Sequence, residues 1–371
     1  MPGQVVCCAQ TCLRTSSTSL IAIPPSRPRP TPSRLMAAAA ADGTVAAAGA
    51  TQQSSRALPR VLSIQSHVVS GYVGNKCAVF PLQLLGFDVD PVNSVQFSNH
   101  TGFPTWNGDI MSGEELWRLV EGLEANGLCR QYTHLLTGYI GSLSVLQTIV
   151  RVAEKLRQCN PDLVYVCDPV MGDDGRLYVR PEMPAAFRDL LVPLASVLTP
   201  NQLETEQLTG RSIGSEADAL AACAALHVRG PHTVVITSSA LPGWEDHVTL
   251  LASTTLPQKG GAPRRLRMRV PRVHAYFTGT GDLFTALLLG WMHRHPGDLK
   301  SALEAAVGGL QAVLRDTVAA CGDAAAAKER TAEVCAAREL RLVQNQAALA
   351  APQRLYAAEP IDMPAGTGLP P

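Results

Sequence analysis

The sequence predicts an α/β fold in which a mostly parallel sheet is covered by helices on both faces. Hydrophobic residues make up 46% of the 371 residues, which is enough for a large core. From about residue 60 onward, short β-rich apolar runs alternate with segments of helical periodicity. These runs are apolar at nearly every position, as is typical of strands that are buried on both faces of a parallel sheet.

The predicted elements follow one another with few interruptions. Strands are expected at 60–65, 88–95, 133–136, 163–167, 196–198 and 233–237, with helices between them at 75–85, 113–126, 142–158 and 216–229. The runs 247–252 and 265–270 are expected to pair as an antiparallel ribbon around a mobile segment, 253–263. Helices then follow from residue 279 to about 293 and at 299–321, and the Ala-rich stretch 324–338 is helix-prone.

Composition divides the chain into a leader, a folded domain and a tail. Residues 1–56 hold five arginines and one acidic residue, Asp42, among many Ser, Thr, Pro and Ala residues. This is the composition of organellar transit peptides, so a plastid or mitochondrial destination is open beside the cytosol. The alternative is a disordered extension with Met36 as the true start. We expect a leader at 1–57, a folded domain at 58–347 and a Pro-rich tail at 348–371.

Charge and cysteine content exclude several classes of protein. The 31 basic and 31 acidic residues cancel, so neither nucleic acid nor an anionic membrane surface is an expected partner. No apolar run reaches the roughly 18 to 20 residues of a membrane span. Ten cysteines without a C-x-x-C pair indicate reduced thiols rather than a secreted disulfide scaffold.

The motif Gly279-Thr280-Gly281-Asp282 follows a β-rich stretch, 274–277, and opens a long apolar helix. Glycine amides and the dipole at a helix start favour an anion there. A carboxylate at the same place repels an anion, but it suits a base that takes a proton from a hydroxyl attacking a bound phosphoryl group. The alternative is that Asp282 is only an N-cap.

Further polar motifs follow other predicted strands. Asp168 and Asp173 follow the fourth strand and could bind Mg²⁺, or simply form a turn. Asn201 and Glu204 come after Thr199 and are three residues apart. Glu204 could organise water bound to a metal ion, or the two residues could form a capping box. Thr237 and Ser238 end the sixth strand and could hold phosphate oxygens. Because open α/β sheets bind ligands at the carboxyl ends of their strands, these motifs predict one site for phosphoryl transfer from a nucleotide to a hydroxyl.

These motifs, in this order, resemble the pyridoxal kinases of the ribokinase superfamily. The resemblance covers about 58–344 and rests on SIQSHVVSGYVGNKCAVFPLQLLGFDVDPVNSVQFSNHTG (63–102), LTGY (136–139), YVCDPVMGD (165–173), LTPNQLE (198–204), VVITSS (234–239) and FTGTGDLF (277–284). It implies a ribokinase-like αβα sandwich, a homodimer, and ATP-dependent phosphorylation of pyridoxal, pyridoxine and pyridoxamine.

The resemblance also implies residue roles. Asp282 would be the general base, and Gly279, Thr280 and Gly281 would form the anion hole for the γ-phosphate. Residues implied at the ring of the vitamer are Ser66, Val73, Phe97, His100, Thr101 and Tyr139. Residues implied at ATP are Asp168, Asn201, Thr237, Ser238, Val273, His274, Ala275 and Thr280. Asp173, Thr199 and Glu204 would bind Mg²⁺ or another divalent ion such as Zn²⁺, with K⁺ or Na⁺ near Thr199.

Two departures from animal members concern the nucleotide side. The loop 172–179 is shorter, and the region 264–274 carries five arginines and ends on His274 where animal members tend to have an acid. The rival predictions are a related kinase for another alcohol, such as hydroxymethylpyrimidine, a catalytically dead homologue that only binds pyridoxal 5′-phosphate, and an interaction role for the tails.

Overall fold

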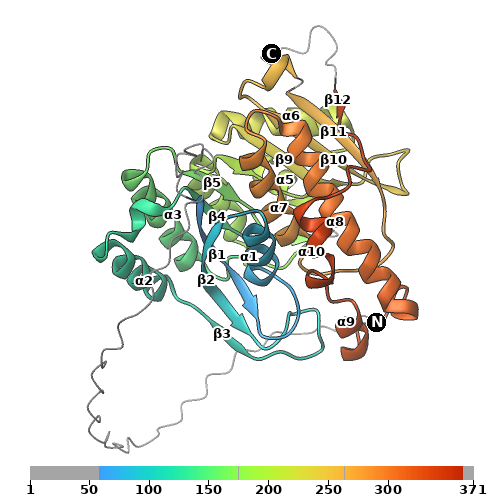
Figure 1. Ribbon diagram of the computed structural model, residues 1–371, viewed down its shortest axis with the longest axis horizontal. Helices are drawn as coiled ribbons and strands as arrows, with labels where there is room; N and C mark the ends of the chain where they lie inside the picture. Colours follow the sequence, from blue (N-terminus) through green and yellow to red (C-terminus); the bar gives the residue numbers. More distant parts are fainter. Residues whose placement is uncertain (1–57, 174, 263, 362–371) are drawn as a thin grey trace, which may run out of the picture. The chain divides into compact units, whose positions relative to one another are not determined.

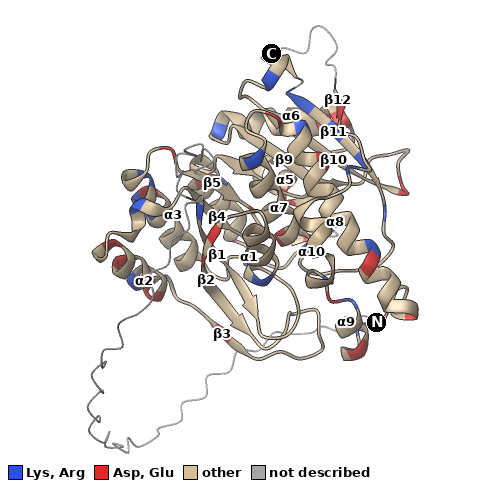
Figure 2. Ribbon diagram, viewed as in Figure 1, with Lys and Arg blue, Asp and Glu red and all other residues tan. Residues whose placement is uncertain are grey.

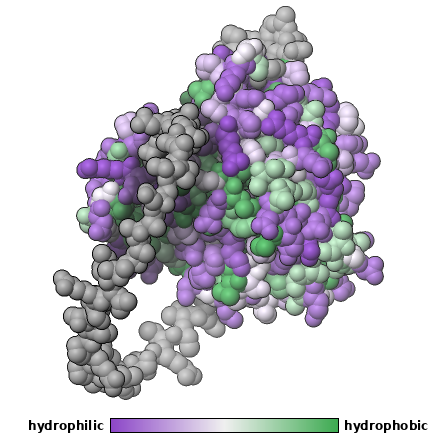
Figure 3. Space-filling model, viewed as in Figure 1, coloured by the Kyte–Doolittle hydropathy of each residue, from purple (hydrophilic) through white to green (hydrophobic). Residues whose placement is uncertain are grey.

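The computed structural model describes residues 58–173, 175–262 and 264–361, which belong to one unit (Figure 1). The leader 1–57 and the end of the tail, 362–371, lie outside the described residues, so the transit-peptide prediction stays a prediction. Within the described part no helix is long and apolar enough to cross a membrane. On the face drawn in Figure 3, hydrophilic residues predominate and hydrophobic ones form small groups.

A ten-stranded sheet runs through this unit in the order β12-β11-β10-β9-β8-β5-β4-β1-β2-β3. Its parallel centre consists of β1 (Arg60–Val68), β2 (Asp88–Phe97), β4 (His134–Thr137), β5 (Val164–Cys167), β8 (Val197–Leu198) and β9 (Thr233–Ser239). Antiparallel strands flank it: β3 (Gly108–Ile110), β10 (His247–Thr254), β11 (Arg265–Pro271) and β12 (Glu359–Pro360). The prediction of a mostly parallel sheet is confirmed.

Helices cover both faces of the sheet, which confirms the αβα sandwich (Figure 1). One layer holds α2 (Gly113–Ala125), α3 (Leu143–Cys159), α4 (Met183–Ala186), α5 (Gln202–Thr209) and α6 (Glu216–Arg229). The other holds α1 (Asn75–Leu84), α7 (Thr280–Arg294), α8 (Leu299–Cys321) and α10 (Gln346–Ala350). A short helix, α9 (Ala332–Ala337), follows α8. Single-turn helices lie at Leu128–Gln131, Phe187–Leu191, Val192–Leu194, Lys259–Gly261, Gly322–Ala325 and Val343–Asn345.

The continuous apolar runs of the sequence follow from burial on both faces. In β1, Leu62 and Ile64 pack into the core on the α3 side, whereas Val61 packs into the core on the α7 side. The same alternation places Leu135 of β4 in the first core and Leu136 in the second. Successive side chains of a strand point to opposite faces, so a strand between two helix layers is apolar at every position.

Three expectations about local structure are wrong. The stretch 274–277 before the Gly279 motif is a loop and not a strand. The Ala-rich segment 324–338 forms only α9 and the turn before it, since Lys328, Glu329 and Arg330 interrupt it with exposed charge. The segment predicted at 253–263 starts too early, because β10 continues to Thr254; within the segment, Lys259–Gly261 forms a helical turn and the Lys259 amide donates to the Gly297 carbonyl (2.7 Å).

The tail boundary at residue 347 also needs correction. Leu349 in α10 and Ala358 are fully buried in the core on the α7 side, and β12 pairs with β11 at the sheet edge. Arg267 of β11 bonds Glu359 of β12 (3.0 Å), and Figure 2 shows the basic strand β11 beside β12. Arg267 also pairs with Glu216 of α6, as does Arg269. The described part of the tail therefore belongs to the domain, and Arg267 helps to hold it there.

A buried histidine at the start of β4 makes the fold sensitive to acid. The ring of His134 lies 5.3 Å from those of Phe87 and His293, and burial together with the nearby His293 lowers the pKa of His134 to about 3. In the unfolded chain this pKa is about 6.5. The unfolded state therefore binds more protons below pH 6.5, so the free energy of unfolding should fall by up to about 1.4 kcal/mol per pH unit as the pH decreases.

Urea titrations between pH 7.5 and 4.5 test this expectation, with His134→Phe as the comparison. Phenylalanine keeps an aromatic ring at this position but cannot be protonated, so the loss of stability towards acid should be smaller in the variant. Equal losses in the two proteins would show that His134 does not contribute.

Candidate active site

The polar motifs found in the sequence meet at one edge of the sheet, where the parallel strands end. The residues predicted at the ring lie in or after β1, β2 and β4. Those predicted at the nucleotide lie in or after β5, β8 and β9, except for Thr280 in α7 and residues 273–275 after β11. Since these strands are neighbours in two groups of three, the two sets of residues form adjacent halves of one site. Strand order alone therefore places an acceptor beside a phosphoryl donor.

The sheet has a switch point between β1 and β4, within the ring half and one strand away from the nucleotide half. Helix α1, which connects β1 to β2, packs on one face of the sheet, and α3, which connects β4 to β5, packs on the other. The connections thus leave adjacent strands in opposite directions, and such switch points open a crevice at the carboxyl ends of the strands. The N-terminus of α7 reaches this place from the α1 layer.

Asp282 lies in this crevice and does not cap its helix. Gly279 occupies the N-cap position of α7, and Asp282 is the third helical residue. Its Oδ2 accepts a hydrogen bond from the Gly74 amide (2.7 Å), and a Cβ on Gly138, the residue after β4, would lie 3.4 Å from Oδ1. Burial raises the pKa of Asp282, and the bond from Gly74 opposes this rise. The N-cap interpretation of Asp282 is therefore wrong.

The start of α7 offers backbone amides to an anion. Gly279 has a φ of 81°, and a Cβ there would lie 2.3 Å from the Tyr72 carbonyl oxygen, so only glycine fits without displacement. No side chain caps the helix, which leaves the first amides of a 15-residue helix available. The Gly281 position faces Asp168, whose Oδ2 would lie 3.6 Å from a Cβ there. Thr280 and Gly281 thus separate Asp282 from the acids of the nucleotide half.

Asp168 and Glu204 are buried carboxylates in the nucleotide half. Only 6% of Asp168 and 3% of Glu204 is exposed. Burial, with Glu204 and Asp282 as further causes, raises the pKa of Asp168 far above its ordinary value. Burial also raises the pKa of Glu204 to about 8, although backbone amides of Asn201, Met171 and Gly172 oppose this. Uncompensated negative charge on hard oxygen atoms suits a divalent cation such as Mg²⁺.

The protein does not enclose such a cation by itself. Within the described ranges no group of three or more His, Cys, Asp or Glu side chains is placed to hold a metal. Asp173, on the short strand β6 (Gly172–Asp173), is exposed. A Mg²⁺ ion at this place would therefore complete its octahedron with water and phosphate oxygens, as Mg²⁺ commonly does.

The remaining nucleotide-side residues are fixed by local hydrogen bonds. Asn201 and Glu204 form a complete capping box at the start of α5, which confirms that structural interpretation. The Asn201 side chain also donates to the Gly172 carbonyl (2.7 Å). Thr199 is buried and its hydroxyl lies 2.9 Å from that of Thr285, and the Thr237 amide donates to the Pro200 carbonyl (2.9 Å). These bonds hold the β8 and β9 ends together.

Residues predicted at the adenine lie in an open loop. Val273, His274 and Ala275 follow β11 without regular structure, and the Ala275 amide bonds the Val273 carbonyl (2.9 Å). The His274 side chain is exposed. Contacts in this loop would therefore come mainly from the backbone, as expected from the change to His274.

On the ring side, Ser66, Val73, Phe97 and Tyr139 are half-buried and Thr101 is exposed. Burial raises the pKa of Tyr139, and Arg180 opposes this rise. His100 differs from the others: its Nδ1 accepts a hydrogen bond from the Gly102 amide (3.1 Å) and its Nε2 lies 3.3 Å from Glu339. Both ring nitrogens of His100 thus face protein atoms rather than the crevice.

A family model described as phosphomethylpyrimidine kinase matches residues 135–326. "Pyridoxal kinase" of Arabidopsis thaliana is 59% identical over 259 residues, which cover 70% of this chain and 82% of that protein. "Pyridoxal kinase" of Sus scrofa is 50% identical over 295 residues, 77% of this chain and 91% of that protein. The chain belongs to the pyridoxal kinase family.

Solved structures agree with this membership. "Pyridoxal Kinase from Leishmania donovani in complex with ADP and Pyridoxine" has a TM-score of 0.74 and 37% identity, and the match covers 82% of this chain and 99% of that one. "Crystal structure of Plasmodium falciparum PdxK with ligands AMP-PNP and PL" has a TM-score of 0.70 at 25% identity, covering 82% and 99%. The ribokinase-like fold expected from the resemblance is confirmed.

Sequence reasoning missed a buried polar chain behind the ring half. Gln65 donates to the Ser63 hydroxyl (2.9 Å), which bonds Asn75 (2.8 Å), and Asn75 bonds Asn93 (2.8 Å). The Oε1 atom of the Gln65 side chain would lie 2.5 Å from a Cβ on Gly138, and the same Cβ would lie 3.4 Å from Asp282 Oδ1. Polar residues inside the first strand were the available signal, because Ser63 and Gln65 interrupt an otherwise apolar run.

Proposed function

We propose that this member of the pyridoxal kinase family transfers the γ-phosphoryl group of ATP to the 5′-hydroxymethyl group of pyridoxal, giving pyridoxal 5′-phosphate and ADP. Pyridoxine and pyridoxamine are the expected alternative acceptors. The observation that carries this proposal is the position of Asp282. Its carboxylate lies in the first turn of α7, a helix that no side chain caps, between the ring half and the nucleotide half. The ligands in the structures of its relatives, ADP with pyridoxine and AMP-PNP with PL, support the same pair of substrates.

In this mechanism, Asp282 accepts the hydroxyl proton as the substrate oxygen forms its bond to the γ-phosphorus. The bond from that phosphorus to the bridging oxygen of ADP breaks on the opposite side, so ADP leaves with its electron pair. Amides of Gly279, Thr280 and Gly281 are placed for the oxygens of the transferred group. Positioning and neutralisation of charge supply most of the rate in such transfers.

The proposed nucleotide contacts are Asp168, Asn201, Thr237, Ser238 and Thr280, with the backbone of 273–275 at the adenine. Asp173, Glu204 and Thr199 would bind Mg²⁺, or another divalent ion such as Zn²⁺, together with K⁺ or Na⁺. The cations would neutralise phosphate charge. Glu204 supports this best, since its raised pKa reflects a buried carboxylate that lacks a counter-ion.

The decisive assay measures pyridoxal 5′-phosphate formation by the full chain with ATP and Mg²⁺, read by the absorbance of the phosphorylated aldehyde. We expect strong turnover of pyridoxal and little of hydroxymethylpyrimidine, which is assayed beside it because of the matching family model. Turnover of hydroxymethylpyrimidine alone would keep Asp282 and the anion hole but overturn the ring assignment. If ADP forms with neither alcohol, a binding protein for pyridoxal 5′-phosphate is the better account.

Two further expectations accompany this function. The resemblance implies a homodimer, for which sedimentation equilibrium gives the mass. The composition of 1–57 suggests organellar import, and otherwise the enzyme would act in the cytosol.

A further inference from the structure

The chain returns to the active-site edge near its C-terminal end, where Glu339 reaches two loops of the ring half. The Glu339 Oε2 accepts a hydrogen bond from the Tyr72 amide (2.8 Å), across 267 residues of sequence. Its Oε1 lies 3.3 Å from His100 Nε2, and only 17% of the Glu339 side chain is exposed. One carboxylate therefore links the loop after β1 to the loop after β2.

The hydrogen bonding around His100 explains why a carboxylate stands here. Because His100 Nδ1 accepts from the Gly102 amide, the proton of the neutral ring is on Nε2, which faces Glu339. Two donors, an amide and a ring N–H, thus approach the two oxygens of one side chain. Among the described residues Glu339 Oε1 forms no hydrogen bond, so its contact with His100 is the weaker one and the bond from Tyr72 to Oε2 is the stronger of the two.

The loop after β1 is shaped to admit this carboxylate. Gly71 has a φ of 95°, and a Cβ there would lie 2.1 Å from Glu339 Oε1. A residue other than glycine would therefore be strained and would displace Glu339. The contact depends on both chain segments, although they are far apart in the sequence.

Each of the two loops carries residues of the site. The first loop ends on Gly74, whose amide donates to Asp282, and a Cβ on Gly74 would lie 2.0 Å from the Ser66 carbonyl oxygen. The second loop runs from Phe97 to Thr101, both of which are expected at the ring. A shift of either loop would change the space available to the vitamer.

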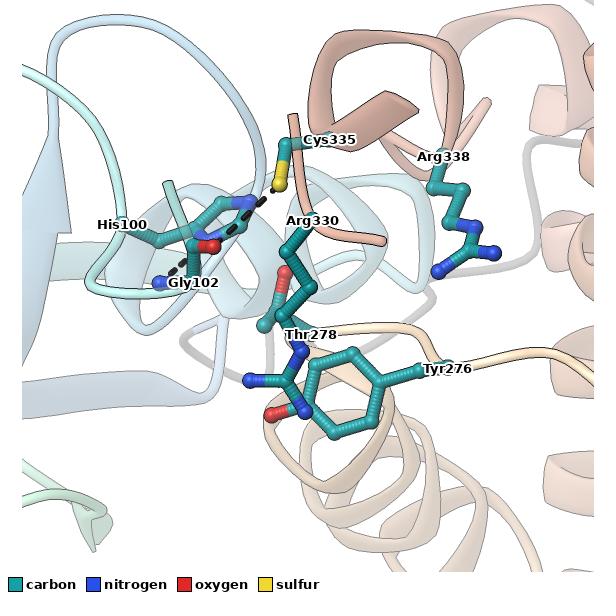
Figure 4. A pocket seen from close by; sticks show the side chains of 7 residues that line it. All are labelled: His100, Gly102, Tyr276, Thr278, Arg330, Cys335 and Arg338. Atoms are coloured by element: carbon teal, nitrogen blue, oxygen red, sulfur yellow. Dashed lines mark hydrogen bonds between the residues drawn. The ribbon is translucent and has the colours of Figure 1, made fainter. Parts of the chain in front are cut away.

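The segment before Glu339 binds the same region from outside (Figure 4). Cys335 donates from its thiol to the Gly102 carbonyl (3.2 Å), and the Arg330 guanidinium lies 3.9 Å above the Tyr276 ring in the loop leading to Gly279. Arg338, which is 8% exposed, holds this segment together by donating to the Ala324 and Ala325 carbonyls. Residues 322–339 thus form a strap over the loop that contains His100.

We propose that Glu339 is a positioning residue, which fixes the loops 69–74 and 97–102 against each other and thereby sets the affinity for the vitamer. It does not touch the reacting atoms. This inference deepens the proposed function and rests on it for its kinetic test, whereas a second measurement is independent of turnover.

The kinetic test compares the wild type with Glu339→Gln, Glu339→Ala and Glu329→Gln. Glu329 is an exposed glutamate of the same strap and serves as the matched control. We expect the KM for pyridoxal to rise about tenfold in Glu339→Ala, since a hydrogen bond to a charged group is lost, and less in Glu339→Gln, which keeps one acceptor. The KM for ATP and the values of Glu329→Gln should stay within about twofold of wild type.

Hydrogen–deuterium exchange supplies the test that needs no turnover. In both Glu339 variants the amides of 69–74 and 97–102 should exchange faster than in wild type and in Glu329→Gln, while β5 and β8 stay unchanged. Gly71→Ala should produce the same pattern from the other side of the contact. Unchanged exchange in these loops, or equal increases in the KM for pyridoxal and for ATP, would overturn the proposal. If the wild type has no activity, the proposed function is overturned. The exchange rates of the two loops would then be the only test of the role of Glu339.

Discussion

Replacement of Asp282 by Asn should remove turnover while leaving both substrates bound. A positioned general base contributes about 10²- to 10⁴-fold to the rate, so kcat should fall by that factor. Asparagine keeps an oxygen that can accept the Gly74 hydrogen bond, which in the aspartate measures 2.7 Å, so the geometry of the crevice should persist. Stopped-flow or steady-state assays give kcat, and calorimetric titration gives the affinities for ATP and pyridoxal.

The stability of the same variant separates lost chemistry from lost folding. Burial raises the pKa of Asp282 in the folded state, so its ionised form opposes folding at neutral pH. Asp282→Asn should therefore unfold at the same urea concentration as wild type or a higher one. Asp298→Asn is the matched control: Asp298 caps the next helix, and asparagine caps equally well, so its activity should not change. An unchanged kcat in Asp282→Asn would refute its role as the base.

The raised pKa of Asp282 also predicts the direction of the acid limb of the rate. The base must be ionised to take the proton, so kcat should fall as the pH decreases through this raised pKa. The fall should therefore begin at a higher pH than for an ordinary aspartate.

The second large effect is expected from Gly279→Ala. The new Cβ would lie 2.3 Å from the Tyr72 carbonyl oxygen, and the alanine would have to adopt a φ of 81°. Relief of this clash must move the first turn of α7 or the loop 71–74, both of which lie at the proposed place of the transferred phosphoryl group. Loss of one oxyanion donor costs about 10²- to 10³-fold in kcat, and we expect a fall of at least that size.

Gly127→Ala separates the clash from the cost of the backbone conformation. Gly127 has a φ of 70°, but no atom lies within 4 Å of a Cβ placed there, and it precedes β4 at the end of the sheet remote from the site. Both variants place alanine at a positive φ, so both should unfold at a lower urea concentration than wild type, whereas kcat should fall only in Gly279→Ala. Equal activity in the two variants would exclude a special role for Gly279.

The sequence alone is enough to predict the layers of this protein and to select residues for its candidate site. Apolar runs separated by helical segments are sufficient to predict a parallel sheet, because burial on both faces demands apolar residues throughout each strand. Motifs after successive strands then predict a common edge, since parallel strands end together. Asp282, Asp168 and Glu204 were selected in this way, although a capping box and a metal ligand look alike in sequence, and Glu204 takes part in a capping box.

Which residues meet across the chain depends on the tertiary structure. It turned His100 away from the crevice, placed Glu339 against Gly71 and Tyr72, and brought Glu359 to the sheet edge beside Arg267. Local periodicity and propensity describe neighbours in sequence, whereas these contacts join segments more than 90 residues apart. Such contacts depend on how the layers pack, so the strap and its positioning of the ring loops become visible only in the folded chain.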